Sequence, residues 1–174
     1  MKSVLISIKP KWCELIANGK KTVEVRKTKP KLETPFKVYI YETKALYKPN
    51  GCNHLFKGEG KVIGEFVCDG IIPISIEYSN PNSRIALKEF PYTCLTDKQI
   101  IDYLGNSNQG YGWHISNLVI YDKPRELNEF KKHNRTCYYD HLGLATPKCK
   151  DCKDCQITRP PQSWLYVESE VDTE

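Results

Sequence analysis

The sequence has no hydrophobic run long enough to cross a membrane. Its 174 residues are 40% hydrophobic and 27% charged, and no apolar stretch approaches the roughly 20 residues that a transmembrane helix needs. Residues 1–10 already carry two lysines and a proline, which is too short and too soon charged for a secretory signal peptide. We therefore expect a cytoplasmic chain with no membrane partner.

The chain also lacks a strong net charge, internal repeats and low-complexity tracts. Its formal net charge is +5, which permits a nucleic-acid partner but does not require one. A length of 174 residues suits one domain with a core of its own. We predict a single domain over residues 1–167, followed by an acidic tail over residues 168–174.

Strands dominate the predicted secondary structure. Alternating or β-branched apolar residues predict strands over residues 3–8, 22–26, 36–41, 61–68, 113–121 and 162–167. Two helices are predicted, over residues 10–18 and 96–104, from their capping residues and apolar spacing. Residues 47–60 are predicted to form a loop, and residues 124–130 a short turn or helix. This mixture predicts the α+β class, with a curled sheet or small barrel.

The segment Gly19–Lys27 has the most informative pattern, with four cations and one carboxylate. Its alternation predicts a half-buried strand whose two faces carry Val23 and Val25, and Thr22, Glu24 and Arg26. Such a strand can present Glu24 and Arg26 to an anion or a polar base, with Lys20 and Lys21 beside them. Two alternatives stay open: a solvated basic turn, or structural pairing of Glu24 with Arg26 or Lys21.

Aromatic and basic residues elsewhere extend this candidate ligand site. Single-stranded bases are bound largely by stacking on aromatic faces. The further candidates for stacking or polar contact are Lys9, Trp12, Tyr111, Trp113, His114 and Trp164. The alternative is that the aromatic residues fill the core, which we favour for Trp12 because it lies on the apolar face of its helix. A structural role is likewise the favoured alternative for His114.

The motif resembles a known family. Gly19, Lys21, Glu24 and Arg26 match the G-x-K-x-x-E-x-R signature of the ASCH domain, a β-barrel of the PUA-like superfamily. Further stretches similar to ASCH proteins of bacterial and phage genomes are residues 7–10, 60–65, 112–115 and 159–164. The resemblance implies a PUA-like barrel with flanking helices, in which the motif lies beside a cleft. It also implies that the chain binds RNA or a modified nucleoside or nucleotide.

An enzymatic activity is the alternative that the resemblance raises. Some small ASCH proteins are amidohydrolases on N-acylated cytidine, in which the motif lysine activates a threonine three residues further on. Here Lys21 keeps the lysine position, but Glu24 stands at the threonine position and cannot act as an acyl-transfer nucleophile in the same way. Thr22 and Glu65 are weak substitutes for the missing members. Lys21 and Glu24 can still form an acid–base pair for amidohydrolase or ribonuclease chemistry.

Eight cysteines form two groups. In a reducing compartment they are expected to be buried thiols or metal ligands rather than disulfides. Four are scattered singly and are expected to be small apolar side chains in or near the core: Cys13, Cys52, Cys68 and Cys94.

The other four cysteines gather in residues 137–155, an insertion before the last strand. Their spacing favours a structural zinc ion held by Cys137, Cys149, Cys152 and Cys155, with His141 as an alternative ligand. An iron–sulfur cluster is less well supported, because Arg159 stands where the ferredoxin spacing has its fourth cysteine. A metal-free loop is the remaining alternative.

Overall fold

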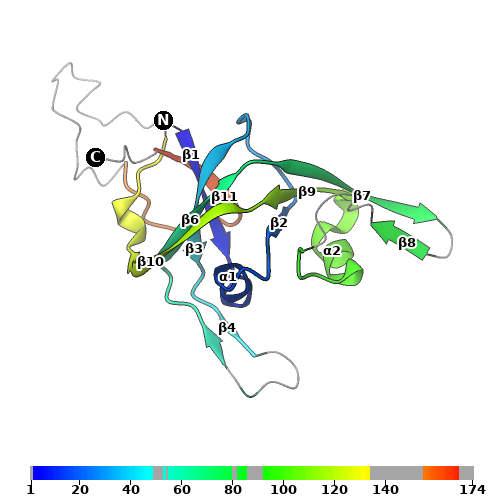
Figure 1. Cartoon of the computed structure of the whole chain (residues 1–174), viewed down its shortest axis with the longest axis horizontal. Helices are drawn as coiled ribbons and strands as arrows, with labels where there is room; N and C mark the ends of the chain where they lie inside the picture. Colours follow the sequence, from blue (N-terminus) through cyan, green and yellow to red (C-terminus); the bar gives the residue numbers. More distant parts are fainter. Residues whose placement is uncertain are drawn as a thin grey trace. The chain divides into compact units, whose positions relative to one another are not determined.

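The computed structural model describes residues 2–48, 53, 55–79, 82–85, 92–133 and 155–168. Within these ranges the chain forms two α-helices, two short 3-10 helices and eleven strands (Figure 1). The chain folds as two compact units, each built from separate stretches of sequence. Unit 1 comprises Met1–Pro10, Val38–Gly64 and Ile120–Glu174, and unit 2 comprises Lys11–Lys37 and Glu65–Val119.

Unit 1 contains all of β1 and β11 and parts of β3, β6 and β10, which belong to a five-stranded sheet with the strand order β10-β6-β3-β1-β11. These strands are β1 (Lys2–Ile8), β3 (Phe36–Glu42), β6 (Val62–Cys68), β10 (Ser116–Arg125) and β11 (Trp164–Glu168). Strand β1 lies between β3, to which it runs parallel, and β11, to which it runs antiparallel. A separate two-stranded sheet pairs β4 (Leu46–Tyr47) with β5 (Phe56–Lys57).

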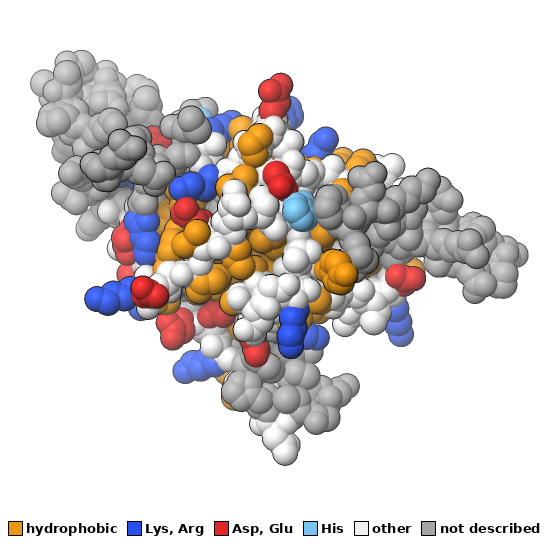
Figure 2. Space-filling model, viewed as in Figure 1, with side chains coloured by type: hydrophobic (Ala, Val, Ile, Leu, Met, Phe, Trp, Pro, Cys, Tyr) orange, Lys and Arg blue, Asp and Glu red, His pale blue; other side chains and the backbone are white. Residues whose placement is uncertain are grey.

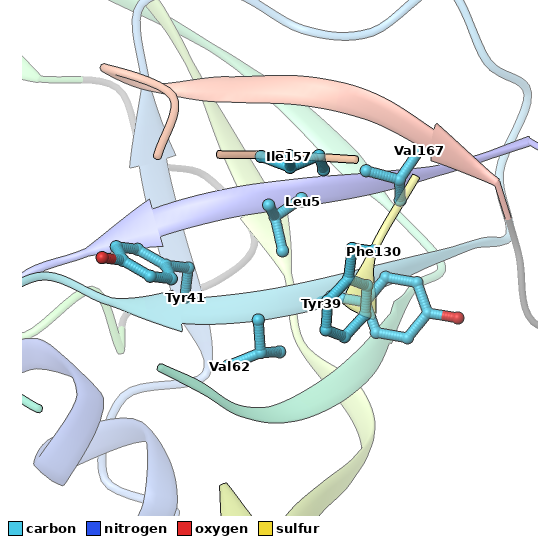
Figure 3. Packing of buried hydrophobic residues seen from close by; sticks show 7 residues of the cluster. All are labelled: Leu5, Tyr39, Tyr41, Val62, Phe130, Ile157 and Val167. Carbon is cyan, nitrogen blue, oxygen red and sulfur yellow. The ribbon is translucent and has the colours of Figure 1, made fainter. Parts of the chain in front are cut away.

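The core of unit 1 lies on this sheet. Leu5, Val62 and Ile157 have no exposed surface, and they pack with two tyrosines, Phe130 and Val167 (Figure 3). The rings of Tyr39 and Phe130 meet edge to face at 5.0 Å. Phe130 follows the 3-10 helix η2 (Leu127–Glu129), so this turn is anchored to the sheet by an aromatic contact.

Unit 2 contains a four-stranded sheet with the order β2-β9-β7-β8. Its strands are β2 (Val23–Arg26), β9 (Gln109–His114), β7 (Ile71–Ser79) and β8 (Asn82–Ile85). Helix α2 (Asp97–Leu104) begins at a capping box formed by Thr96 and Gln99, and 3-10 helix η1 (Gly105–Ser107) follows it. The helix buries Ile100 and Leu104 in a cluster with Val25, Ile74 and Ile76. The second helix of this unit, α1 (Pro10–Ala17), precedes β2.

Most predicted elements are confirmed to within one or two residues. The predicted strands at residues 3–8, 22–26, 36–41, 61–68 and 162–167 correspond to β1, β2, β3, β6 and β11, and the two predicted helices to α1 and α2. The α+β class is therefore confirmed. The described strand pairings form separate sheets, so the closed barrel remains an expectation. No helix in the described residues is long and apolar enough to cross a membrane.

Three predictions of local structure are wrong in part, and one long strand was not predicted. The strand predicted over residues 113–121 is two strands, because Ile115 donates its N–H to Thr22 and Asn117 has a left-handed backbone. The loop predicted over residues 47–60 includes the short strand β5. Strand β7 was not predicted, since Pro73 lies inside it and interrupts the apolar pattern. Finally, β10 extends into the turn predicted over residues 124–130, which nevertheless contains η2.

Candidate functional site

A tight turn positions the motif between α1 and β2. The backbone N–H groups of Lys20 and Lys21 both donate to the carbonyl of Leu15, at 2.9 and 3.0 Å. Gly19 has φ +68°, and no atom lies within 4 Å of the position that a Cβ would take. The left-handed backbone, rather than a lack of space, therefore requires glycine at this position.

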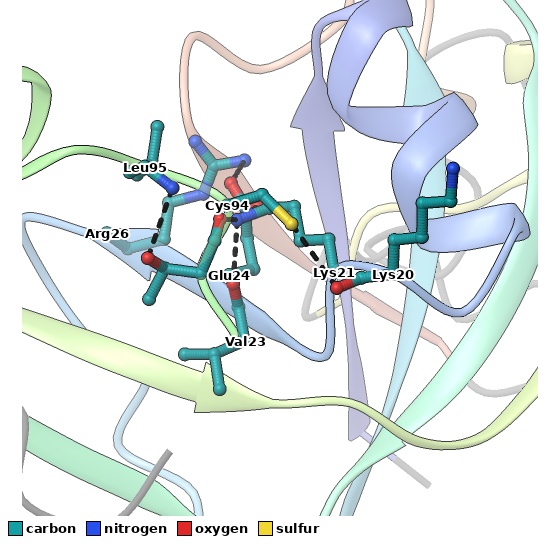
Figure 4. A network of polar contacts seen from close by, with 8 residues as sticks. Lys20, Lys21, Val23, Glu24, Arg26, Cys94 and Leu95 are labelled. Carbon is teal, nitrogen blue, oxygen red and sulfur yellow. Dashed lines mark hydrogen bonds and ion pairs between the residues drawn. The ribbon is translucent and has the colours of Figure 1, made fainter. Parts of the chain in front are cut away.

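The charged residues of the motif form a buried network (Figure 4). Lys21 is 2% exposed, Glu24 5% and Arg26 8%. The Glu24 carboxylate lies between the two cations, 3.2 Å from Lys21 Nζ and 3.1 Å from Arg26 Nη2. Lys21 Nζ also donates to the carbonyls of Val23 and Thr93, each at 2.7 Å. The Lys21 ammonium therefore donates two hydrogen bonds to backbone carbonyls and forms an ion pair with the Glu24 carboxylate.

A distant segment, residues 92–95, completes this network and covers the edge of β2. Its carbonyl at Tyr92 accepts hydrogen bonds from Thr22 and Val23. Its exposed thiol at Cys94 contacts the Lys20 carbonyl at 3.2 Å. The segment lies about 70 residues from the motif in sequence, and the motif holds it through Lys21. The alternative of structural pairing therefore describes Glu24 better than an open ligand cleft does.

The predicted face assignment of β2 agrees with the strand register. Glu24 pairs with Trp113 and Arg26 with Tyr111 in the antiparallel β2–β9 ladder, and directly paired residues share a face of the sheet. Val25 lies in the apolar cluster with α2 instead. Lys20, by contrast with Lys21, is exposed.

The sheet face that carries Arg26 is partly open around Tyr111. Tyr111 is half-buried, and in the register it stands between Arg26 on β2 and the exposed Pro73 on β7. The ammonium of the exposed Lys29 lies 5.4 Å from the centre of the Tyr111 ring. A second pair of this kind joins Lys27 to Tyr103 of α2, at 5.5 Å. Such cation–aromatic pairs are typical of surfaces that bind single-stranded nucleic acid.

The other predicted aromatic residues do not join Tyr111 in one platform. Trp113 has no exposed surface, and its ring packs edge to face on Phe36 at 5.9 Å. In this structure it therefore offers no face to a base. Trp12 is half-buried rather than in the core, with the ammonium of Lys11 4.4 Å from its ring. Trp164 and Lys9 belong to unit 1, where Trp164 packs on Tyr166 at 5.3 Å.

His114 forms a polar pair with Asp69 at the end of β9. Its Nδ1 lies 2.5 Å from Asp69 Oδ1, and the two side chains are 25% and 44% exposed. Burial raises the pKa of Asp69, but hydrogen bonds from His114 and Ser116 outweigh this effect, so that the pKa lies below its ordinary value. Burial and the charge of Asp69 raise the pKa of the adjacent Cys68 thiol to about 12, which keeps it protonated and inert.

The basic character of the site is local. Residues 19–37 contain seven cations and two carboxylates, a net of +5 that equals the formal net charge of the whole chain. On the face shown in Figure 2, side chains of both signs are interspersed. Positive charge thus gathers in the turn before β2, in β2 itself and in the loop after it.

The predicted metal site lies almost entirely outside the described residues. Cys137, His141, Cys149 and Cys152 fall there, as does Cys52, whereas Cys155 is described and buried. Among the residues that are described, no group of three His, Cys, Asp or Glu side chains could hold a metal ion. Of the single cysteines, Cys13 and Cys68 are buried as expected, but Cys94 is exposed. The zinc site remains a prediction.

Three residues of the site were missed by the sequence analysis. Lys27 and Lys29 follow the strand in the run Lys27-Thr28-Lys29-Pro30-Lys31, and this density of lysines was a usable signal. Asp69 gave no such signal, because 45 residues separate it from His114 and only the fold brings them together.

Comparisons with known proteins agree with the motif. Solved structures with a similar fold include ASCH from Zymomonas mobilis, with a TM-score of 0.58 and 17% identity over 95% of this chain and 87% of that one. A mutant of that protein with one tyrosine changed to phenylalanine gives a TM-score of 0.56 and 18% identity, over 97% and 91%. These identities establish similarity of fold. A comparison with curated proteins gave no match.

A model of the ASCH domain matches residues 6–122, a range that contains the motif, α1, α2 and the sheet of unit 2. The buried Lys21–Glu24–Arg26 network therefore lies inside the family's own sequence pattern. The chain belongs to the ASCH domain family.

Proposed function

We propose that this ASCH protein binds single-stranded RNA on the face of the unit 2 sheet around Tyr111. The observation that carries the proposal is the pairing of a half-buried tyrosine ring with the exposed ammonium of Lys29, 5.4 Å away. A base stacks on the ring, and Lys29 meets the phosphate next to it. The resemblance of the motif to a family associated with RNA supports RNA over DNA.

The buried network has a supporting role in this proposal. Arg26 is directly opposite Tyr111 in the sheet, and Glu24 holds its guanidinium at 3.1 Å. With one carboxylate between two cations, the network keeps one positive charge beneath the stacking face. That charge attracts phosphate without a direct contact. The motif therefore builds the floor of the site, and the loop after β2 supplies the contacts.

Fluorescence anisotropy with a labelled uridine oligonucleotide tests this site. Tyr111→Ala should weaken binding by roughly 5-fold to 150-fold, because one stacked base contributes about 1–3 kcal/mol. Tyr111→Phe should bind nearly as well, since the aromatic face remains. Lys29→Met should weaken binding and lower the salt dependence by about one phosphate contact.

Lys2→Met is the matched control, because Lys2 stands 3.7 Å over the ring of Tyr166 in unit 1. It should leave the affinity for RNA unchanged. Unchanged affinity of Tyr111→Ala, with folding verified by circular dichroism, would show that RNA does not use this face. An equal loss of RNA affinity in Lys2→Met and Lys29→Met would mean that the effect comes from the net charge of the protein and not from this site.

A hydrolase is the second candidate function, and the direct contact between Lys21 Nζ and Glu24 Oε2 at 3.2 Å favours it. In this alternative Glu24 takes a proton from a water molecule, which attacks the acyl carbon of an N-acylated cytidine or the phosphorus of RNA. Lys21 donates a proton to the leaving cytidine amine or ribose oxygen as the C–N or P–O bond breaks. Turnover of N-acetylcytidine and of RNA, measured for wild type and Glu24→Gln, tests it. Loss of turnover by a variant that still folds and keeps its RNA affinity is the expected result for an enzyme, and no turnover by wild type contradicts it.

A further inference from the structure

Unit 1 contains a cavity that the RNA site does not use. Its volume is about 640 Å³, within the range of roughly 300–1,000 Å³ that is usual for small-molecule sites. It lies between the end of β3, the loop before β6, the turn η2 and residues 157–160. All of its lining residues belong to unit 1.

One side of the cavity is apolar. The lining includes the half-buried Leu127 of η2 and the exposed Pro160, together with the buried Ile157. Tyr41 adds its ring to the core, and in Figure 3 its hydroxyl points away from Leu5 and Val62. Burial and then the charge of Glu126 raise the pKa of Tyr41, so the phenol keeps its proton and can donate a hydrogen bond.

The charged residues at the cavity carry a net charge of +1 once the ion-pair partner of Glu126 is counted. Its lining contains one ammonium, Lys44, and one carboxylate, Glu126. Glu126 is already paired with Lys61 at 3.2 Å. The charge of Lys44 is therefore the one that a ligand of opposite sign can neutralise.

Gly60 keeps the side chain of Lys44 in place. A Cβ at Gly60 would lie 2.4 Å from both Cγ and Cε of Lys44, so the aliphatic stem packs directly on the glycine backbone. Gly60 also has φ +74°, which an L side chain adopts only with strain. Both features favour glycine at this position, and the missing side chain leaves the space that the lysine stem fills.

From these groups we propose that the cavity binds a small organic anion with an apolar body. Its carboxylate or phosphate meets the ammonium of Lys44, and its body packs against Leu127 and Pro160. This ligand site goes beyond the proposed RNA site, shares no residue with it, and stands or falls separately.

Isothermal titration calorimetry on the full chain tests the proposal with matched probes. Phenylacetate and phenylacetamide share an apolar body but differ in charge, and phenyl phosphate and phenol provide the same contrast for phosphate. Acetate and inorganic phosphate provide the anion alone. At least one of the two anions with a body should bind about tenfold more tightly than its neutral partner. The bare anions should not saturate the protein. Which pair shows the difference identifies the headgroup.

Two variants at the cavity and two control variants separate this cavity from other sites. Lys44→Met should remove the advantage of the anion over its neutral partner, and Gly60→Ala should reduce it by displacing the lysine stem. Lys123→Met, an exposed lysine on β10 of the same unit, should change nothing, and neither should Lys29→Met. Absence of binding by both anions at millimolar concentration overturns the proposal. So do equal affinities for charged and neutral probes, or an equal loss in Lys44→Met and Lys123→Met.

Discussion

Lys20 and Lys21 are neighbours in sequence with opposite surroundings. Lys20 is exposed, whereas the ammonium of Lys21 is enclosed by one carboxylate and two backbone carbonyls. Removing one partner from a buried charge network leaves the others without compensation. The two lysines therefore form a matched pair for measuring what the motif contributes to folding.

Lys21→Met should lower the free energy of unfolding by roughly 3–5 kcal/mol. It leaves Glu24 with a single cation and strands the carbonyls of Val23 and Thr93. Lys20→Met should stay within about 0.5 kcal/mol of wild type. Urea unfolding followed by circular dichroism measures both. Similar values for the two variants would contradict a structural role for the motif.

Asp69 gives the fold a dependence on pH. Its pKa in the folded state is below the ordinary value of 3.8, because hydrogen bonds from His114 and Ser116 outweigh the effect of burial. A lowered acid pKa means that the ionised form stabilises the fold. This contribution is fully present above pH 3.8 and is lost as the pH falls through the lower folded value.

Asp69→Asn should therefore be less stable than wild type at pH 7, and the difference should shrink steadily below the ordinary pKa of 3.8. Urea unfolding at a series of pH values measures the difference directly. Asp122→Asn, at an exposed position of β10, is the control and should show a smaller difference throughout. A gap between wild type and Asp69→Asn that is constant with pH would contradict this assignment.

At the residue scale, the sequence predicted the face of the strand on which a side chain lies better than it predicted the burial of that side chain. Alternation placed Glu24 and Arg26 on one face of β2 correctly, because a strand has a fixed period of two. It could not show that both are buried. The segment that covers them, residues 92–95, follows from tertiary contacts about 70 residues away. Paired charges inside a fold look the same in sequence as exposed ones.

At the scale of elements, β9 and α2 pack together at Gly110, which has no side chain. A Cβ at Gly110 would lie 2.5 Å from Cδ2 of Leu104 and 3.0 Å from the Arg26 carbonyl. The helix therefore approaches the strand closely at this point, and the same contact fixes the end of β2. This packing positions the loop that carries Lys27 and Lys29.

Gly110→Ala should destabilise the fold by about 1–3 kcal/mol through overpacking. Gly70→Ala is the matched control, since its Cβ would meet only the Cβ of His114 at 3.9 Å, and it should stay within about 0.5 kcal/mol of wild type. Thermal unfolding of the two variants side by side gives the comparison. A tolerated Gly110→Ala would mean that α2 can move away from the sheet without cost.

Elements with strong local signals were predictable from sequence. Helix α2 has both halves of a capping box, Thr96 and Gln99, and both appear in the sequence at the required spacing. The break between β9 and β10 was not predictable. It depends on Ile115 turning its N–H to Thr22, a contact with a strand edge far away in sequence. Sequence patterns within one element give no information about a hydrogen bond to a distant strand.

At the scale of the whole molecule, each compact unit is assembled from separated stretches of chain. Because the stretches of one unit are far apart in sequence, the chain between them must leave the unit and return to it. Residues 131 and 156 form an isolated antiparallel bridge, and Lys132 donates its N–H to Cys155 at 2.9 Å. The residues on either side of the cysteine-rich stretch are therefore hydrogen-bonded to each other. Bringing together the two ends of so long a stretch of chain costs conformational entropy.

We propose that a structural zinc ion offsets this cost, held by Cys137, Cys149, Cys152 and Cys155, or with His141 in place of one of them. The purified protein should then contain about one equivalent of zinc. Removing it with a chelator should lower the melting temperature, because metal binding contributes to folding in such sites. Cys152→Ser should lose the metal, whereas Cys94→Ser, at an exposed thiol outside this stretch, should retain it. His141→Ala decides between four thiolates and three with one imidazole. Zinc well below one equivalent in freshly purified wild type, with no change in melting temperature on chelation, would contradict the proposal.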